Sequence, residues 1–189
     1  ATYNGEKFIL EQLNSINNQS IKPEEIVICD DASKDDTFKI INNFINNVNI
    51  SIKIIKHKKN LGYHRAFETA IKNCSGDIIF ISDQDDVWFK KKIENTIKIF
   101  DEKKNINLII NDSIFTDEKL SSLQITKIEI YKKLYNNLNY YIAGCNCAFK
   151  KKLLDLYIPF PKNFIAYDYW LNKIAISLGS RFVNFNVLQ

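Results

Sequence analysis

The stretch DIIFISDQDDVW, residues 77–88, leads an apolar, strand-forming run directly into three aspartates and a tryptophan. Asp83, Asp85 and Asp86 take three of four consecutive positions at the end of that run. Carboxylates packed this closely repel one another unless a cation, a proton or solvent relieves them. The pattern therefore raises three alternatives for the end of this strand: a cation site, a protonated carboxylate or a solvated cluster.

The composition of the 189 residues is that of a globular domain, 46% hydrophobic and 25% charged. A net charge of +4, spread over scattered lysines, gives no reason to expect a nucleic-acid partner. No apolar run reaches the ~18–20 residues of a membrane span, and no signal segment is recognised. The four cysteines include no C-x-x-C pair, so a structural zinc site is not expected. Because methionine is absent, we expect the natural chain to start before Ala1.

Helix-like and strand-like apolar patterns alternate along the first 112 residues. Helical spacing covers 6–19, a segment around 40–48, 63–74 and 89–103, whereas apolar runs typical of strands cover 24–30, 51–57, 77–83 and 107–112. The second half is less regular, with a helix expected near 127–137, a strand at 140–149 and a helix from about 168. This alternation predicts a single α/β domain over residues 1–189 with a mostly parallel sheet and helices on both faces.

Three of the predicted strands end in acidic residues. These are Asp30 and Asp31, then Asp83 to Asp86, then Asp112. The carboxyl ends of parallel strands form the ligand crevice of such sheets, so these carboxylates should meet there. Helix capping is the alternative for any one of them, but it accounts for one aspartate per junction rather than three.

Two kinds of chemistry fit the acids after the third strand. Asp83, Asp85 and Val87 form a D-x-D-x-V that resembles the nucleophile loop of haloacid-dehalogenase phosphatases, with Asp83 attacking phosphorus. Alternatively, hard carboxylate oxygens hold Mg²⁺ or Mn²⁺ against a diphosphate. An EF-hand-like calcium loop at 31–42 fails, because its sixth and twelfth positions are Asp36 and Asn42.

Six motifs, in order, resemble those of inverting A-type (family 2-like) glycosyltransferases, in particular bacterial rhamnosyltransferase-type members that build polysaccharides. They are TYNGEKFILEQLNSINNQS, IVICDDASKDDT, NLGYHRAF, GDIIFISDQDDVW, AGCNCAF and YDYW. The resemblance covers Thr2 to about Leu178 and implies a Rossmann-like GT-A domain that uses Mg²⁺ or Mn²⁺. It also implies that the first strand precedes Ala1, so that the chain is trimmed at its start and at its C-terminus.

The resemblance assigns roles by position. It places the donor nucleotide against Thr2, Tyr3, Asn4, Asp31, Asn60, Arg65, Asp83 and Gln84. Within this set Asp31 matches the acid that accepts a base N–H, and Asp83 the acid that contacts the ribose. Asp85, together with Asp83, matches the metal ligand. Asp86 is left open between a supporting role and a helix cap, and an ion pair with Glu68 is the alternative for Arg65.

The remaining requirement is a base for the acceptor hydroxyl. In FIAYDYWLNKIA, residues 164–175, Asp168 is placed at the start of a helix between aromatic residues and matches the acidic motif of the family. A helix N-cap is the alternative role for Asp168. Tyr63, Tyr167 and Trp170 are candidates to border the acceptor.

Together these residues predict a metal-dependent inverting glycosyltransferase. The expected partners are a UDP- or dTDP-sugar donor and a glycan or lipid-linked acceptor in surface polysaccharide synthesis. The expected location is the cytoplasm, with peripheral association at the inner face of the membrane. The alternatives are the phosphatase and a sugar-nucleotide-binding remnant without catalysis.

Overall fold

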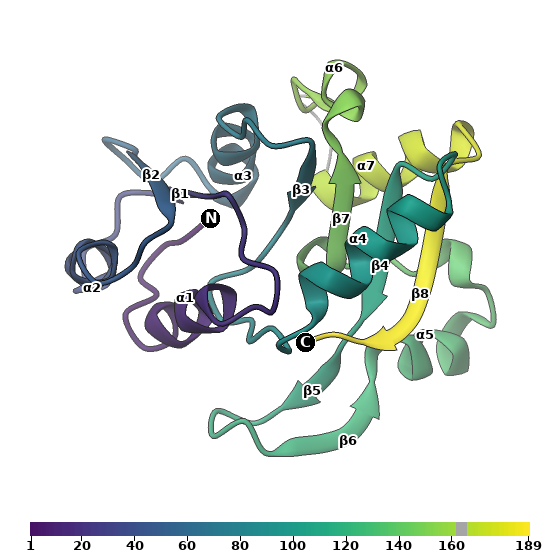
Figure 1. The fold of residues 1–189 in the computed structure, drawn as a ribbon, viewed down its shortest axis with the longest axis horizontal. Coiled ribbons are helices and arrows are strands. Elements are labelled where there is room, and N and C mark those ends of the chain that lie inside the picture. Colours follow the sequence, from purple (N-terminus) through teal and green to yellow (C-terminus); the bar gives the residue numbers. More distant parts are fainter. Residues whose placement is uncertain (162–165) are drawn as a thin grey trace.

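The strands of the described residues are divided among three sheets (Figure 1). The structure, a computed structural model, describes residues 1–161 and 166–189. A parallel pair is formed by β1 (Glu25–Asp30) and β2 (Ser51–Lys56). The second sheet, in the order β3-β7-β4-β8, contains β3 (Ile78–Phe80), β7 (Cys147–Lys150), β4 (Leu108–Asp112) and β8 (Arg181–Val187). A hairpin of β5 (Ile114–Thr116) and β6 (Ser122–Thr126) projects from it.

Six of the seven α-helices in the described residues form where the apolar spacing predicted them, with ends shifted by a few residues, whereas the short helix Leu154–Tyr157 was not predicted. The helices are α1 (Ile9–Asn17), α2 (Thr37–Ile45), α3 (Tyr63–Lys72), α4 (Lys92–Glu102), α5 (Lys127–Tyr135), α6 (Leu154–Tyr157) and α7 (Tyr167–Ser177). Short 3-10 turns are η1 (Leu138–Tyr140), η2 (Gly144–Asn146) and η3 (Lys151–Leu153). None of the helices in the described residues is long and apolar enough to cross a bilayer.

The predicted α/β architecture is confirmed, but the sheet is mixed. β4 runs parallel to β8, whereas β7 runs antiparallel to both of its neighbours, β3 and β4. The connection from β4 to β7 contains the β5–β6 hairpin and α5, and it returns the chain antiparallel to β4. The expected strand at 140–149 is correspondingly shorter, because η1 and η2 occupy most of its first seven residues.

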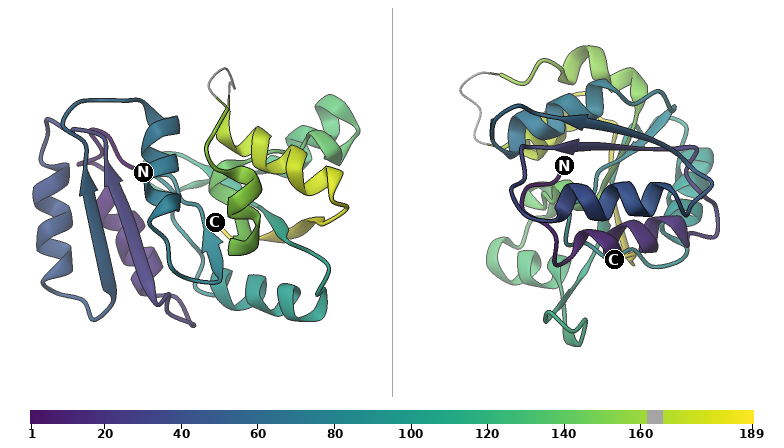
Figure 2. Two further views of the ribbon diagram at one scale, coloured as in Figure 1. Left: turned by 90° about the horizontal axis from the view of Figure 1, so that it is seen from above. Right: turned by 90° about the vertical axis from the view of Figure 1, so that its left-hand side faces the viewer.

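Helices cover both faces of the four-stranded sheet, as predicted. Along β4, Leu108 and Ile110 belong to the apolar cluster that contains Leu171 of α7. Ile109 points to the other face and packs in the cluster of Phe100 from α4. Figure 2 shows the sheet between these two helices, with β1, β2 and α2 forming a separate block at one side.

A cavity lies between the parallel pair of β1 and β2 and the four-stranded sheet. It has a volume of about 360 Å³ and lies between the facing sides of β1 and β3, with α1 and α3 contributing apolar side chains. Among the described residues only Thr2 pairs with the free side of β1, where its N–H donates to the Cys29 carbonyl oxygen (2.9 Å) and its carbonyl oxygen accepts from the Asp31 N–H (2.9 Å). Thr2 therefore runs parallel to the end of β1 and brings the first residues of the chain to the carboxyl edge of the sheet.

Candidate active site

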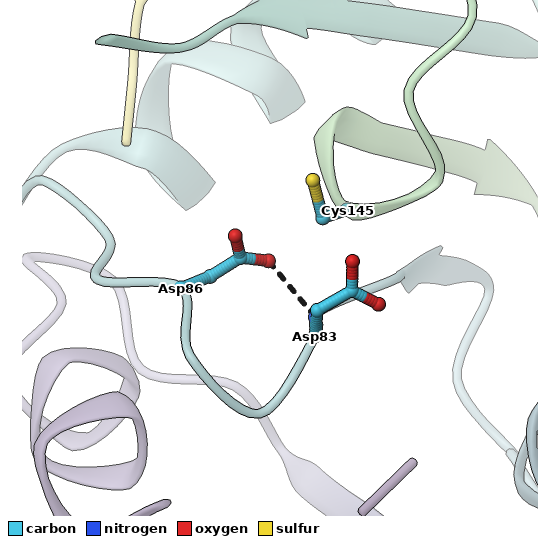
Figure 3. Close-up of side chains that lie close together, drawn as sticks. All are labelled: Asp83, Asp86 and Cys145. Carbon is cyan, nitrogen blue, oxygen red and sulfur yellow. Dashed lines mark hydrogen bonds between the residues drawn. The ribbon is translucent and has the colours of Figure 1, made fainter. Parts of the chain in front are cut away.

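The acidic residues after β3 form a tight turn rather than a solvated cluster. The Asp83 N–H donates to Asp86 Oδ2 (2.8 Å), which closes the turn, and the Asp86 N–H donates to the Asp83 carbonyl oxygen (3.3 Å). As Figure 3 shows, both side chains lie below the turn that carries Cys145. Ligand atoms of these three residues lie within 4.8 Å of one another. Asp86 does not cap a helix, because α4 begins only at Lys92.

The electrostatics of this turn are unfavourable for two ionised carboxylates. Burial, followed by the charge of Asp86, raises the pKa of Asp83 to about 6. Burial also raises the pKa of Asp86, although Lys92 opposes the shift. A divalent cation is one of the factors that lower such repulsion, so the pair meets the first condition for a metal site.

The donor atoms fit a hard divalent cation. Both oxygens of Asp86 already accept hydrogen bonds, one from the Asp83 N–H and one from Gln189 Nε2 (3.2 Å). Among the described residues no hydrogen bond reaches the carboxylate oxygens of Asp83 or of the exposed Asp85. Burial keeps the pKa of the Cys145 thiol well above its usual range, so that sulfur stays protonated and is a poor ligand for Mg²⁺ or Mn²⁺. The oxygens of Asp83 and Asp86 therefore lie close enough to share such an ion, whereas Asp85, the other predicted ligand, is exposed and does not belong to this group of ligand atoms.

Gln84 ties this turn to the start of the chain. Its Oε1 accepts hydrogen bonds from Thr2 Oγ1 (2.8 Å) and from the Tyr3 N–H (2.9 Å). Asn4 is linked in turn to the loop after β1, where its N–H donates to Ser33 Oγ (2.9 Å). The structure thus brings together the predicted residues of the N-terminal loop and of the acidic turn, with Tyr3 exposed at the surface.

Asp31 is buried, and its carboxylate binds the backbone of the loop that contains Leu61 and Gly62. Its carboxylate accepts hydrogen bonds from the N–H groups of Leu61 (2.9 Å to Oδ1) and Gly62 (2.8 Å to Oδ2). His57 Nδ1 lies 2.6 Å from the same Oδ1. Gly62 has a φ of 86°, which a side chain would disfavour, and it immediately precedes α3. In this arrangement Asp31 fixes the loop that carries Asn60 and the start of α3.

Asn60 and Arg65 lie on either side of the start of α3 and make local contacts. Asn60 Oδ1 accepts from the Gly62 N–H (3.1 Å). Arg65 pairs with Glu68 (2.5 Å), the alternative considered for it, and about half of its side chain remains exposed. The ion pair with Glu68 therefore leaves part of the Arg65 side chain accessible to solvent.

Asp168 lies within the first turn of α7. The N-cap of this helix is Ala166, without a side-chain hydrogen bond, so the capping alternative for Asp168 is wrong. Its Oδ2 instead accepts from the Gly144 N–H (3.1 Å), next to Cys145. A Cβ on Gly144 would meet Tyr167 Oη at 2.2 Å, so this glycine allows the tyrosine to pack against the turn. Phe164 and Ile165 of the same motif lie outside the described residues.

Three residues that support the site were not identified from the sequence. His57 follows β2 and lies between Asp31 and Thr69, and its place at a strand end could have indicated it. Lys92 and Gln189 form a hydrogen bond beneath the acidic turn. Burial lowers the pKa of Lys92 to about 8, against the opposing charge of Asp86. No local pattern distinguishes Lys92 from Lys90 and Lys91 beside it.

Comparison with known proteins identifies the family. The model of the family described as "Glycosyl transferase family 2" matches residues 1–157. WfaP from Escherichia coli, named as a UDP-Glc:alpha-D-GlcNAc-diphosphoundecaprenol beta-1,3-glucosyltransferase, is 31% identical over 97% of this chain and 72% of its own. The dTDP-rhamnosyl transferase RfbG from Shigella flexneri is 41% identical over 51% of this chain and 35% of its own. The poly(ribitol-phosphate) beta-N-acetylglucosaminyltransferase TarS of Staphylococcus aureus is 32% identical over 58% of this chain and 19% of its own. The chain thus spans less than two thirds of the last two relatives.

Solved structures confirm the GT-A fold. Residues 1–349 of S. aureus TarS in complex with UDP superpose with a TM-score of 0.79 at 23% identity, over 99% of this chain and 56% of that one. The mannosyltransferase PcManGT of Pyrobaculum calidifontis, in complex with GDP-Man and Mn²⁺, gives a TM-score of 0.73 at 21% identity, over 98% of this chain and 52% of that one.

Proposed function

The chain belongs to glycosyl transferase family 2, and we propose that it is a metal-dependent inverting glycosyltransferase of surface polysaccharide synthesis. The proposed donor is a UDP- or dTDP-sugar and the acceptor a glycan or a lipid-linked saccharide. The names of WfaP and RfbG, which include these two kinds of nucleotide, support this choice. Family membership gives no support to the phosphatase.

One observation carries the proposal. The three predicted parts of the site, from distant segments of the chain, are connected by short contacts. Gln84 links the N-terminal loop to the acidic turn. Cys145 lies against Asp83 in that turn, and the neighbouring Gly144 holds Asp168. A carboxylate pair and a separate carboxylate base are what inverting transfer from a diphosphate donor needs.

In the proposed reaction each of these groups has a defined task. Asp83 and Asp85 would hold the divalent cation, which would offset negative charge on the diphosphate. Asp168 accepts the proton of the acceptor hydroxyl while that oxygen forms a bond to the anomeric carbon on the face opposite the diphosphate. The bond from the anomeric carbon to the phosphate oxygen breaks, and its electron pair leaves with the nucleoside diphosphate. The configuration of the sugar is thereby inverted.

The two hydrogen bonds at Asp168 suit this role. Gly144 N–H donates to Oδ2, and the Tyr169 N–H donates to Oδ1 (2.8 Å). Hydrogen bonds to both oxygens fix the direction of the carboxylate. Lone pairs remain on both oxygens to receive the hydroxyl proton.

A thermal-shift titration with nucleotides tests the donor and the metal. We expect UDP or dTDP to raise the melting temperature only when Mn²⁺ or Mg²⁺ is present, and Asp85→Ala to abolish this metal-dependent rise. Asp117→Ala, an exposed acid on the β5–β6 hairpin, serves as the matched control. A wild-type protein that binds these nucleotides equally well in EDTA would contradict metal dependence. Binding without sugar release or transfer would favour the non-catalytic remnant.

A further inference from the structure

Lys92 is a completely buried lysine without a carboxylate partner. Its exposed fraction is 0%, and among the described residues no acid forms an ion pair with it. The ammonium group instead donates to Gln189 Oε1 and to the Cys145 carbonyl oxygen (3.2 Å), and it lies 4.4 Å from the centre of the Trp88 ring. The hydrogen bonds of Lys92 reach neutral oxygens, and the charge of Asp86 acts on it from beyond ion-pair distance. Burial of the ammonium group therefore still costs stability, so its presence calls for another explanation.

The two oxygens that accept hydrogen bonds from Lys92 belong to residues that contact the two parts of the candidate active site. Gln189 also contacts the acidic turn. Its Nε2 donates a hydrogen bond to Asp86 Oδ1 (3.2 Å), and Asp86 Oδ2 accepts a hydrogen bond from the Asp83 N–H (2.8 Å). Cys145 belongs to the η2 turn, whose Gly144 N–H holds Asp168 Oδ2 (3.1 Å). The ammonium group of Lys92 therefore contacts both Gln189, which is bound to the acidic turn, and the η2 turn, which is bound to Asp168.

We propose that Lys92 is a positioning residue that fixes the acidic turn 83–86 relative to the η2 turn that holds Asp168. The inference rests on the proposed function for the roles of Asp83, Asp85 and Asp168, but the contacts themselves do not. An ammonium group suits this task because it supplies three donors in different directions. Its positive charge also polarises the Gln189 amide, which strengthens the hydrogen bond from Nε2 to Asp86.

Without the contacts of Lys92, the distance between the bound donor and the proposed base Asp168 would no longer be fixed. Transfer requires the acceptor oxygen, held by Asp168, to approach an anomeric carbon positioned by the acidic turn. Small errors in such an approach reduce the rate strongly, even when both ligands still bind. Loss of Lys92 should therefore lower kcat more than it changes KM for the donor.

Hydrogen exchange on the protein without ligands tests the contacts directly. In Lys92→Met, which keeps an unbranched side chain, we expect the amides of Asp83 and Gly144 to exchange about tenfold faster or more. Lys98→Met is the matched control, because Lys98 lies on the same helix with 74% of its side chain exposed. The control should leave both amides unchanged. Amides of β4 should be unaffected in either variant, since replacing a buried charge with an apolar residue often leaves global stability unchanged.

A second variant separates the two arms of the contact. Gln189→Glu keeps an oxygen for Lys92 but removes the Nε2 donor and places a carboxylate beside Asp86. We expect faster exchange at Asp83 and no change at Gly144. In transfer assays both variants should lose about 10- to 100-fold in kcat, with a smaller change in KM.

Three results would overturn the inference. One is wild-type exchange at both amides in Lys92→Met, and another is exchange that rises equally in β4, which would make Lys92 a general stability residue. The third is normal kcat in a Lys92→Met protein whose turns have loosened. Failure of the proposed function is distinguished by the wild-type protein, which would then show no metal-dependent response to nucleotides.

Discussion

Substitution of Gly144 with alanine perturbs the packing that holds the proposed base. A Cβ at this position would lie 2.2 Å from Tyr167 Oη, 2.7 Å from its Cζ and 3.1 Å from its Cε2. Tyr167 cannot move aside freely, because it is 6% exposed and its ring centre lies 4.4 Å from that of Phe67. Either the tyrosine or the η2 turn must shift, and Asp168 is bound to both.

The size of the effect follows from this overlap. Overpacking of a well-packed site costs roughly 1–3 kcal/mol. For a domain of this length each kcal/mol lowers the melting temperature by about 2–4 °C, so a decrease of about 2–12 °C is expected. The Gly144 N–H to Asp168 hydrogen bond should lengthen as well, and the rate of transfer should fall by more than the nucleotide affinity.

Thermal melting and steady-state transfer assays measure the two effects. Gly76→Ala is the matched control, because the nearest atom to a Cβ there lies at 3.8 Å. Adding Tyr167→Phe to Gly144→Ala removes the closest atom but leaves Cζ in place, so it should restore part of the lost stability. If Gly144→Ala melts and transfers like the wild type, Tyr167 does not set the position of the η2 turn and this reasoning fails.

Three further predictions address the remaining parts of the site and the fold. Asp168→Asn should reduce transfer by about 10²–10⁴-fold and leave the metal-dependent thermal shift with UDP intact, and normal transfer would exclude Asp168 as the base. Asp31→Asn should lower the free energy of unfolding in urea by about 2–4 kcal/mol, because it places an amide N–H group among three donors, whereas the exposed Asp101→Asn should change it by less than about 1 kcal/mol. A short segment of β-branched residues fused before Ala1 should raise the melting temperature by filling the cavity beside β1, at about 1.5–3 kcal/mol per buried side chain before the cost of ordering it. The same segment with alternate prolines, which cannot complete a strand, is the control, and an equal rise with both would contradict strand insertion.

Local patterns in the sequence were sufficient for the elements that precede the site. The spacing of Ile9, Leu13 and Ile16 located α1, and all three are buried. Such patterns reflect one buried face, which the local chain alone determines. They do not determine strand direction, so the antiparallel β7 was not foreseen. Residues 183–187 of β8 alternate apolar and polar residues, a period-two pattern that the sequence analysis did not use. In the fold the polar Asn184 is the buried position and Phe185 is exposed, so this pattern alone would have given the wrong buried face.

The contacts that complete the site join residues far apart in the chain. Gln189 lies 103 positions from Asp86, and Lys92 lies 53 positions from Cys145. The sequence located acids at the strand ends but did not show which of them would be engaged by the protein. Asp112, for example, accepts hydrogen bonds from the Ser113 N–H (2.9 Å) and the Ile128 N–H (3.0 Å). Asp86 accepts two hydrogen bonds from the protein, whereas Asp83 and Asp85 keep their oxygens available within the described chain. This division of roles depends on burial and on donors supplied by tertiary structure, neither of which has a local signature.

Asp31 shows most clearly how tertiary contacts limit a role assigned by position. A carboxylate offers about four lone-pair sites. Leu61 N–H contacts both oxygens (2.9 and 3.1 Å), Gly62 N–H contacts one and His57 Nδ1 the other. A nucleotide base that donates an N–H to Asp31 must therefore replace one of these contacts. The weakest is the shared contact from Leu61, which belongs to the same loop as Asn60. If Asp31 binds the nucleotide base as predicted, residues 60–62 must move when the donor binds.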